Sequence, residues 1–136
     1  MSALITQGQW AASIGGAQKI VDMCDDDLDG TADPAVVSAV LEEASDFVQE
    51  YAVAAGGALI AGGLTASMRR RVAFVAAYYA ASRRPEYRDA NGNPAYKVEY
   101  DTAVAELKAW SSRVRSVSTD PVSTAPEILS DESRGW

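Results

Sequence analysis

Residues 34–51, PAVVSAVLEEASDFVQEY, have the clearest helical pattern in the chain. Their apolar side chains recur at intervals of three and four residues, as Val37, Val40, Leu41, Ala44, Phe47, Val48 and Tyr51. Polar side chains fill the positions between them, as Ser38, Glu42, Glu43, Ser45, Asp46, Gln49 and Glu50. This spacing predicts a long helix with one apolar stripe and one solvated stripe. Asp33 is expected to cap it, with Pro34 in the first turn and Gly56-Gly57 after its end.

The rest of the chain predicts further helices around this one. Residues 6–24 have helical spacing interrupted by Gly15-Gly16, which favours two short helices over one. Residues 65–82 are apolar nearly all round, which is typical of a helix that is central in its fold or buried against another subunit. Asn93-Pro94 predicts the start of a last helix, whose pattern stops after Ser116. No stretch predicts a strand, so the expected fold is all-α, a small bundle of about four helices in residues 1–116.

Residues 117–136 have a different composition from the bundle. They are rich in Ser, Thr, Pro and Asp, and carry few large apolar side chains. Such a segment buries too little apolar surface to join a core, and becomes ordered when it meets a partner. We expect an extended C-terminal arm for partner docking, with these residues in contact: Ile128, Leu129, Arg134 and Trp136.

Composition excludes several functions. The chain has 136 residues, no histidine, one cysteine and a net charge of −7. Histidine-based triads and zinc sites are therefore excluded, and the acidic surface attracts nucleic acid poorly. Cys24 is expected to be a buried thiol without a catalytic role. We expect no enzymatic activity and no cofactor. We also expect no membrane contact, because the apolar run at 72–81 has about half the length of a bilayer span.

An acidic segment, residues 25–33, could bind a cation. Asp25, Asp27, Asp29 and Gly30 match the first half of a calcium-binding loop, and Asp33 falls at its ninth position. The twelfth position, where such loops carry a bidentate glutamate, is Val36. We therefore favour a solvated turn over a metal site. A calcium-binding helical interaction module remains the alternative function.

A basic run lies in the first turns of the apolar helix at 65–82. It consists of Arg69, Arg70 and Arg71, and Arg83 and Arg84 follow the same helix. Cations in a first helical turn oppose the helix dipole, so an anion should compensate them. We expect carboxylate partners, either in a neighbouring protein or within the chain at Glu42, Glu43, Asp46 or Glu50. A small DNA-binding regulator is a third interpretation, which the net charge disfavours.

The order of these parts resembles the tailed-phage head–tail connector family, the adaptor or head-completion proteins. The segments that carry the resemblance are AVLEEASDFVQEY at 39–51, RRRVAFVAAYY at 69–79, YDTAVAEL at 100–107 and SRGW at 133–136. The arginine-tyrosine-proline segment usual after the family's second helix is replaced here by Ala54-Ala55-Gly56-Gly57.

The resemblance implies a structural protein without enzymatic activity. Family members form a ring, commonly a dodecamer, between the portal protein and a tail-side stopper or tail-completion protein. Double-stranded DNA passes through the lumen of the ring without sequence-specific binding. The implied location is the virion, at the head–tail junction, after synthesis in the host bacterial cytoplasm. In such a ring the acidic surplus would form a lining that repels the DNA backbone.

Overall fold

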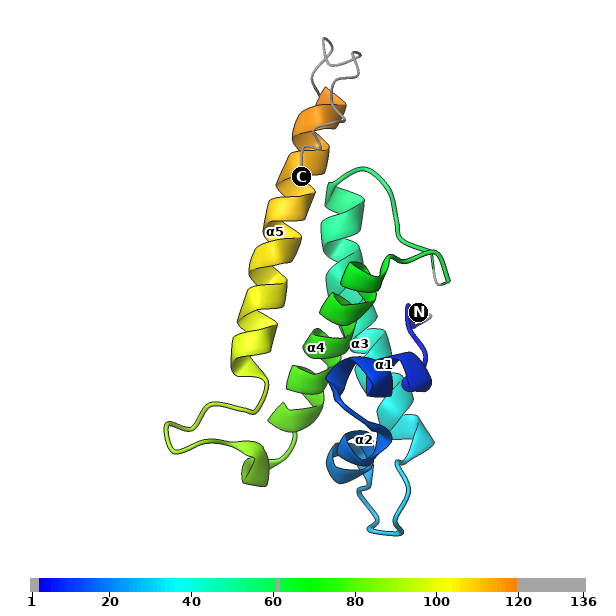
Figure 1. The fold of residues 1–136 in the computed structure, drawn as a ribbon, viewed down its shortest axis with the longest axis vertical. Coiled ribbons are helices and arrows are strands. Elements are labelled where there is room, and N and C mark those ends of the chain that lie inside the picture. Colours follow the sequence, from blue (N-terminus) through cyan, green and yellow to red (C-terminus); the bar gives the residue numbers. More distant parts are fainter. Residues whose placement is uncertain (1–2, 61, 120–136) are drawn as a thin grey trace.

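The computed structural model describes residues 3–60 and 62–119, and these are helical with short connections. The elements are α1 (Gln7–Ile14), α2 (Ala17–Cys24), α3 (Pro34–Ala54), α4 (Ala66–Ser82), the 3-10 turn η1 (Pro85–Tyr87) and α5 (Lys97–Thr119). Figure 1 shows α3, α4 and α5 as the long elements, with α1 and α2 packed near one end. The described residues contain no strand, so the predicted all-α class is confirmed. Among them, no helix is both long and apolar enough to cross a membrane.

The two predicted N-terminal helices are present and separate. The Thr6 hydroxyl accepts from the backbone N–H of Gln9, and the Gln9 side chain accepts from the N–H of Thr6. This reciprocal pair satisfies two amides that the first turn of α1 leaves free. At its other end α1 stops at Gly15, whose φ of 103° suits glycine best. The glycine pair therefore divides the helices as predicted.

Helix α3 forms where its sequence predicts, but its cap differs. Asp33 occupies the N-cap position and its carbonyl accepts from the N–H of Val37 at 3.0 Å. Its carboxylate does not bond to the first turn, and instead accepts from the backbone N–H of Asp26 at 2.9 Å. The predicted side-chain cap is wrong because the preceding loop folds back and supplies a competing donor.

Helix α4 lies at the centre of the molecule. It packs against α1, α3 and α5, and its buried residues are Met68, Val72, Ala73, Val75, Ala76, Ala77, Ala80 and Ala81. Its many alanines let the neighbouring helices approach closely. Trp10 of α1 is fully buried and donates from Nε1 to the Ala73 carbonyl at 3.0 Å. Of the two interpretations of this apolar helix, the central position is the one found, since its own chain covers it.

Helix α5 begins later than predicted and ends later. Asn93 and Pro94 belong to a tight loop. The Asn93 carbonyl accepts from the N–H of Asp89, and Pro94 forms an isolated antiparallel β-bridge with Arg88. The helix starts at Lys97, after Tyr96 with a φ of 68°. The predicted Asn-Pro cap is therefore wrong. The helix continues through residues 117–119, and its end projects beyond α3 in Figure 1.

Candidate functional site

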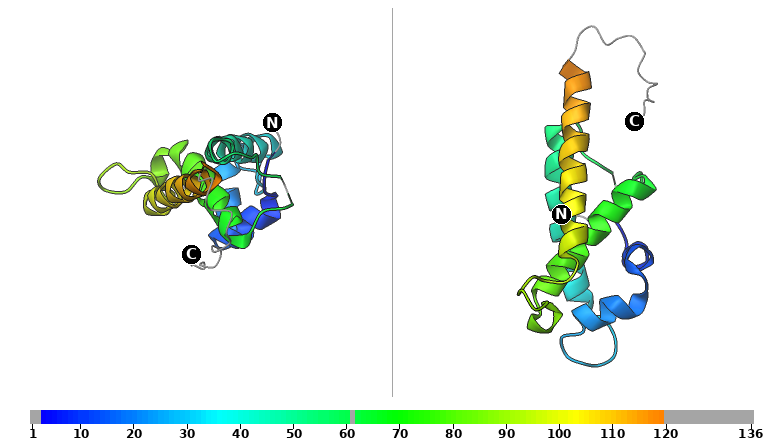
Figure 2. Two further views of the ribbon diagram at one scale, coloured as in Figure 1. Left: turned by 90° about the horizontal axis from the view of Figure 1, so that it is seen from above. Right: turned by 60° about the vertical axis from the view of Figure 1, so that its left-hand side comes forward.

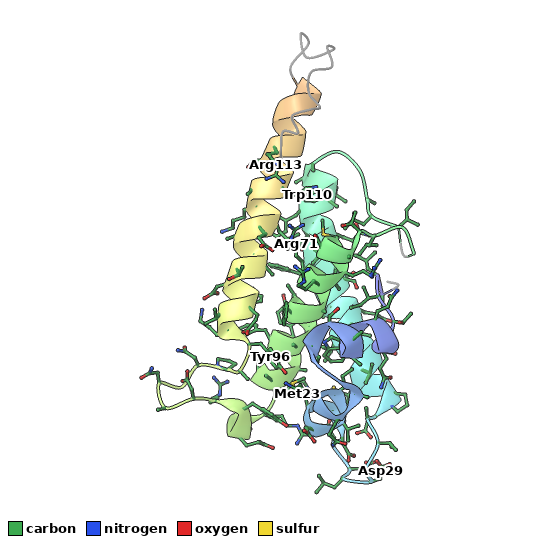
Figure 3. All side chains as sticks on the ribbon, in the orientation of Figure 1. Met23, Asp29, Arg71, Tyr96, Trp110 and Arg113 are labelled. Carbon is green, nitrogen blue, oxygen red and sulfur yellow. The ribbon has the colours of Figure 1, made fainter. Side chains whose placement is uncertain are left out.

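The acidic segment forms a closed loop between α2 and α3. Asp25 is 7% exposed, and its two carboxylate oxygens accept from the N–H groups of Asp29 at 3.0 Å and Gly30 at 2.8 Å. The N–H of Asp33 donates to the Cys24 carbonyl at 2.9 Å and closes the loop. Figure 3 places Asp29 in this loop at the end of the bundle opposite Arg113. The sequence predicted a turn here, but not that Asp25 would be buried and organise it.

Four carboxylates converge in this loop. One oxygen each of Asp25, Asp27, Asp29 and Asp33 lies within 4.8 Å of the others. Hard oxygen ligands at this spacing are what a divalent cation requires. Val36, at the position of the bidentate glutamate, lies in the first turn of α3 and offers no ligand atom. The predicted ligand residues are therefore brought together, without the strongest ligand of a calcium loop.

The convergence changes the acidity of two side chains. A hydrogen bond shared with the Asp25 carboxyl, followed by desolvation and the charges of Asp29 and Asp33, raises the pKa of Asp27 to about 6. The backbone N–H and hydroxyl of Thr31 donate to Asp29 at 3.0 Å and 2.9 Å, and these bonds lower the pKa of Asp29. The loop thus concentrates negative charge and leaves Asp27 ready to take up a proton.

Arg83 and Arg84 join the end of α4 to the acidic loop. Their guanidinium groups pair with the Asp26 carboxylate at 2.5 Å and 2.8 Å. Both also donate to the Met23 carbonyl, which is near the C-terminal end of α2. Cations at a helix C-terminus are stabilising because they satisfy free carbonyls and complement the dipole. The sequence predicted partner contacts for these arginines, and the structure places both in contacts within the chain.

Asp26 is a residue of this region whose contacts the sequence did not reveal. It lies between the ligand positions of the calcium pattern, so the motif passed over it. Its arginine partners are 57 and 58 residues away. No local signal links residues at that separation, and only the packing of α2 beside α4 brings them together.

The three arginines at the start of α4 have different surroundings. Arg69 donates to the Leu64 carbonyl at 2.8 Å, and Arg71 pairs with Glu106 of α5 at 3.1 Å; Figure 3 shows Arg71 beside α5. Arg70 is exposed and pairs with no carboxylate of the described residues. Within those residues, the expected pairing with the acids of α3 does not occur, since Arg71 finds its partner on α5.

An aromatic cluster fills the space between α3, α4 and α5. Tyr78 and Tyr100 stack with ring centroids 4.1 Å apart, and Phe47 meets Tyr51 and Tyr79 edge to face at 5.5 Å and 6.3 Å. Burial, with the nearby Tyr100, raises the pKa of Tyr79. The rings are half-buried. The sequence placed Phe47 and Tyr51 on the apolar stripe of the helix at 34–51, and helix packing brings Phe47 against Tyr79 of α4.

Cys24 is fully buried, and burial raises the pKa of its thiol to about 11. At neutral pH the group is therefore a protonated thiol, which is a poor nucleophile. Its surroundings suit the structural role that the sequence predicts.

The remaining predicted contact residues, Ile128, Leu129, Arg134 and Trp136, lie outside the described residues. A scan against protein-family models, a search of curated proteins and a search of solved structures found no match to this chain.

Proposed function

We propose that this chain is a structural head–tail connector, or adaptor, of a tailed phage or phage-like particle. Its subunits form a ring beneath the portal protein, and double-stranded DNA passes through the ring on its way to the tail. The tail-side neighbour is a stopper or tail-completion protein. The protein acts at the head–tail junction of the virion and has no catalytic step.

The observation that carries this proposal is the order of the helices. A short helix pair, an acidic turn, the 21-residue α3, the buried α4 and the 23-residue α5 follow one another, and this order of parts is the one on which the sequence resemblance rests. Helix α5 projects past α3 (Figure 1), and residues 120–136 follow it in the sequence. A projecting helix is well placed to present a following segment to a neighbouring protein.

The self-contained core also suits a structural part. Helix α4 is covered by its own chain, so each subunit can fold before it assembles. The outer surface of the folded subunit then remains available for contacts with neighbouring proteins. The negative net charge of −7 favours a surface that repels passing DNA.

Binding to the portal tests the proposal. The full chain is mixed with the portal protein encoded in the same genome, and the mixture is analysed by velocity sedimentation. We expect the chain to move with the portal as one heavier species. A portal that sediments alone, with the chain at tens of micromolar, about the range of weak specific complexes, would contradict the proposal.

A second candidate function rests on the four converging carboxylates of the acidic loop. A calcium-binding helical interaction module would use Asp25, Asp27, Asp29 and Asp33 as ligands. Calorimetric titration with calcium separates the two candidates, since a sensor site binds in about the micromolar range. Micromolar binding combined with no affinity for the portal would favour the calcium module. The absence of a heat signal would leave the connector as the better account.

A further inference from the structure

Helix α3 carries an acidic face, which we call the acidic stripe. It consists of the exposed Glu43 and Glu50 with the half-buried Asp46 between them, one helical turn apart or nearly so, and Val53 continues it at 63% exposure. None of the three acids pairs with a cationic side chain of the described residues. The Oδ1 atom of Asp46 is buried and has no hydrogen-bond partner there.

A groove of opposite charge lies between α1 and α4. We call it the arginine groove, and it is lined by Gln9, Ala12, Ser13, Ala66, Arg69 and Arg70. No carboxylate lines it, and its other side chains are small or polar. Arg69 is held by the Leu64 carbonyl, while the exposed Arg70 projects without a described carboxylate partner. The groove thus offers two cations beside small side chains to an approaching surface.

The two surfaces lie on different faces of the chain. Helix α4 packs against both α1 and α3, which share no extensive contact with each other. In both views of Figure 2, α1 and α3 are separate neighbours of α4. The stripe occupies the side of α3 that is turned away from α4, because the buried positions Val40, Ala44 and Val48 take the other side. One chain cannot bring its own stripe to its own groove.

We infer that the acidic stripe of one copy docks into the arginine groove of the next copy. Complementary surfaces on different faces of one chain give a head-to-tail contact, and such contacts close into rings when the rotation between subunits allows it. Val53 adds apolar area next to the charges, and Ala12 and Ala66 allow close approach. This inference rests on the proposed ring and names the two surfaces that build it.

Charge reversal tests the contact in the full chain. Arg70→Glu puts an acid opposite the stripe, and the double variant Glu43→Lys, Glu50→Lys puts cations opposite the groove. Each should weaken self-association by about tenfold or more in sedimentation equilibrium, because like charges across an interface repel. A 1:1 mixture of the two variants restores opposite charges at every contact, so association should return. Arg113→Glu, the same charge change on α5, is the matched control and should leave association unchanged.

Several outcomes would overturn the inference. One is an equal effect of Arg70→Glu and Arg113→Glu, and another is no recovery in the mixture. A wild-type chain that stays monomeric up to about 1 mM, the limit of weak association, would also contradict it. So would a groove that binds duplex DNA in place of a second copy.

Portal binding by the wild-type chain keeps the two proposals apart. If the wild type binds the portal while the charge reversals leave self-association unchanged, only the inferred contact is wrong. If neither variant nor wild type binds the portal, the proposed function itself fails.

Discussion

At the scale of single residues, Asp26 connects three elements through one carboxylate. It pairs with Arg83 and Arg84, which also hold the Met23 carbonyl. Partly exposed pairs of this kind contribute up to about 1 kcal/mol each. The contact is therefore a modest but specific link between the acidic loop and the end of α4.

Asp26→Asn should lower the free energy of unfolding by about 1 kcal/mol, because both charge pairs lose their anion. Thermal or urea unfolding followed by circular dichroism measures the change. Asp22→Asn is the control, since Asp22 accepts only from the neighbouring Gln18 side chain at 2.8 Å. Equal effects of the two substitutions would show that the arginine contacts stabilise nothing.

Asp27 gives the acidic loop a pH dependence with a defined sign. Its pKa of about 6 in the folded chain lies above the value of 3.8 expected when unfolded. The native state therefore holds the proton more tightly, and this contribution to stability is complete below about pH 4 and lost as the pH rises through about 6. The hydrogen bonds that Thr31 donates to Asp29 have the opposite effect, since they lower the pKa of Asp29.

Asp27→Asn should remove that loss, because asparagine can donate to Asp25 at any pH. The melting temperature of the variant should exceed that of the wild type above pH 7, and the gap should close toward pH 4. Melting curves across this range measure it. A gap that does not change with pH would contradict the assigned protonation.

At the scale of elements, α4 decides how the other helices are arranged. Its alanines Ala73, Ala76 and Ala77 are 0% exposed, with neighbouring helices packed against them. Since the helices packed on these alanines belong to the same chain, a larger side chain at these positions must destabilise the monomer. If another subunit covered α4, the unassembled monomer would tolerate a larger side chain.

Ala77→Leu should therefore destabilise the chain by about 1–3 kcal/mol, the usual cost of overpacking. The loss should be independent of protein concentration in thermal unfolding. Ala105→Leu, the same change at an exposed position of α5, is the control. A loss that appears only at concentrations where the chain assembles would show that the cover is intermolecular.

The elements also show where sequence patterns are sufficient. Periodicity and glycine placement correctly predicted α1, α2, α3 and α4, because those signals act within a few residues. The start of α5 was predicted wrongly, since Asn93 and Pro94 pair with Asp89 and Arg88 across a tight loop. The Asp33 cap was wrong for a similar reason, as a donor from the returning loop competes with the helix amides. A local helix-start pattern does not determine whether the capping residue bonds to the helix amides or to another part of the chain.

In the whole molecule, local sequence patterns again do not reveal the contacts of the candidate sites that depend on helix packing. The convergence of the acidic side chains followed from their close spacing in the sequence. The partners of the arginines did not, because Arg71 meets Glu106 and Arg84 meets Asp26 only through helix packing. That the acidic stripe and the arginine groove lie on different faces of the bundle is likewise a property of the packed chain.

Removal of residues 121–136 separates folding from docking. All described helices end at or before Thr119, so the helical circular-dichroism signal should remain, while portal attachment should be lost. The full-length chain is the control in the same sedimentation assay. Unchanged attachment of the truncated chain would refute the docking role proposed for the arm.

Electron microscopy of this chain in complex with the portal protein tests whether the chain forms a ring beneath the portal. The connector account predicts a closed ring of helical subunits beneath the portal, coaxial with its channel. It also predicts that the acidic stripe of each subunit faces the arginine groove of the next. A bare portal, or single copies attached without contact to one another, would contradict the account.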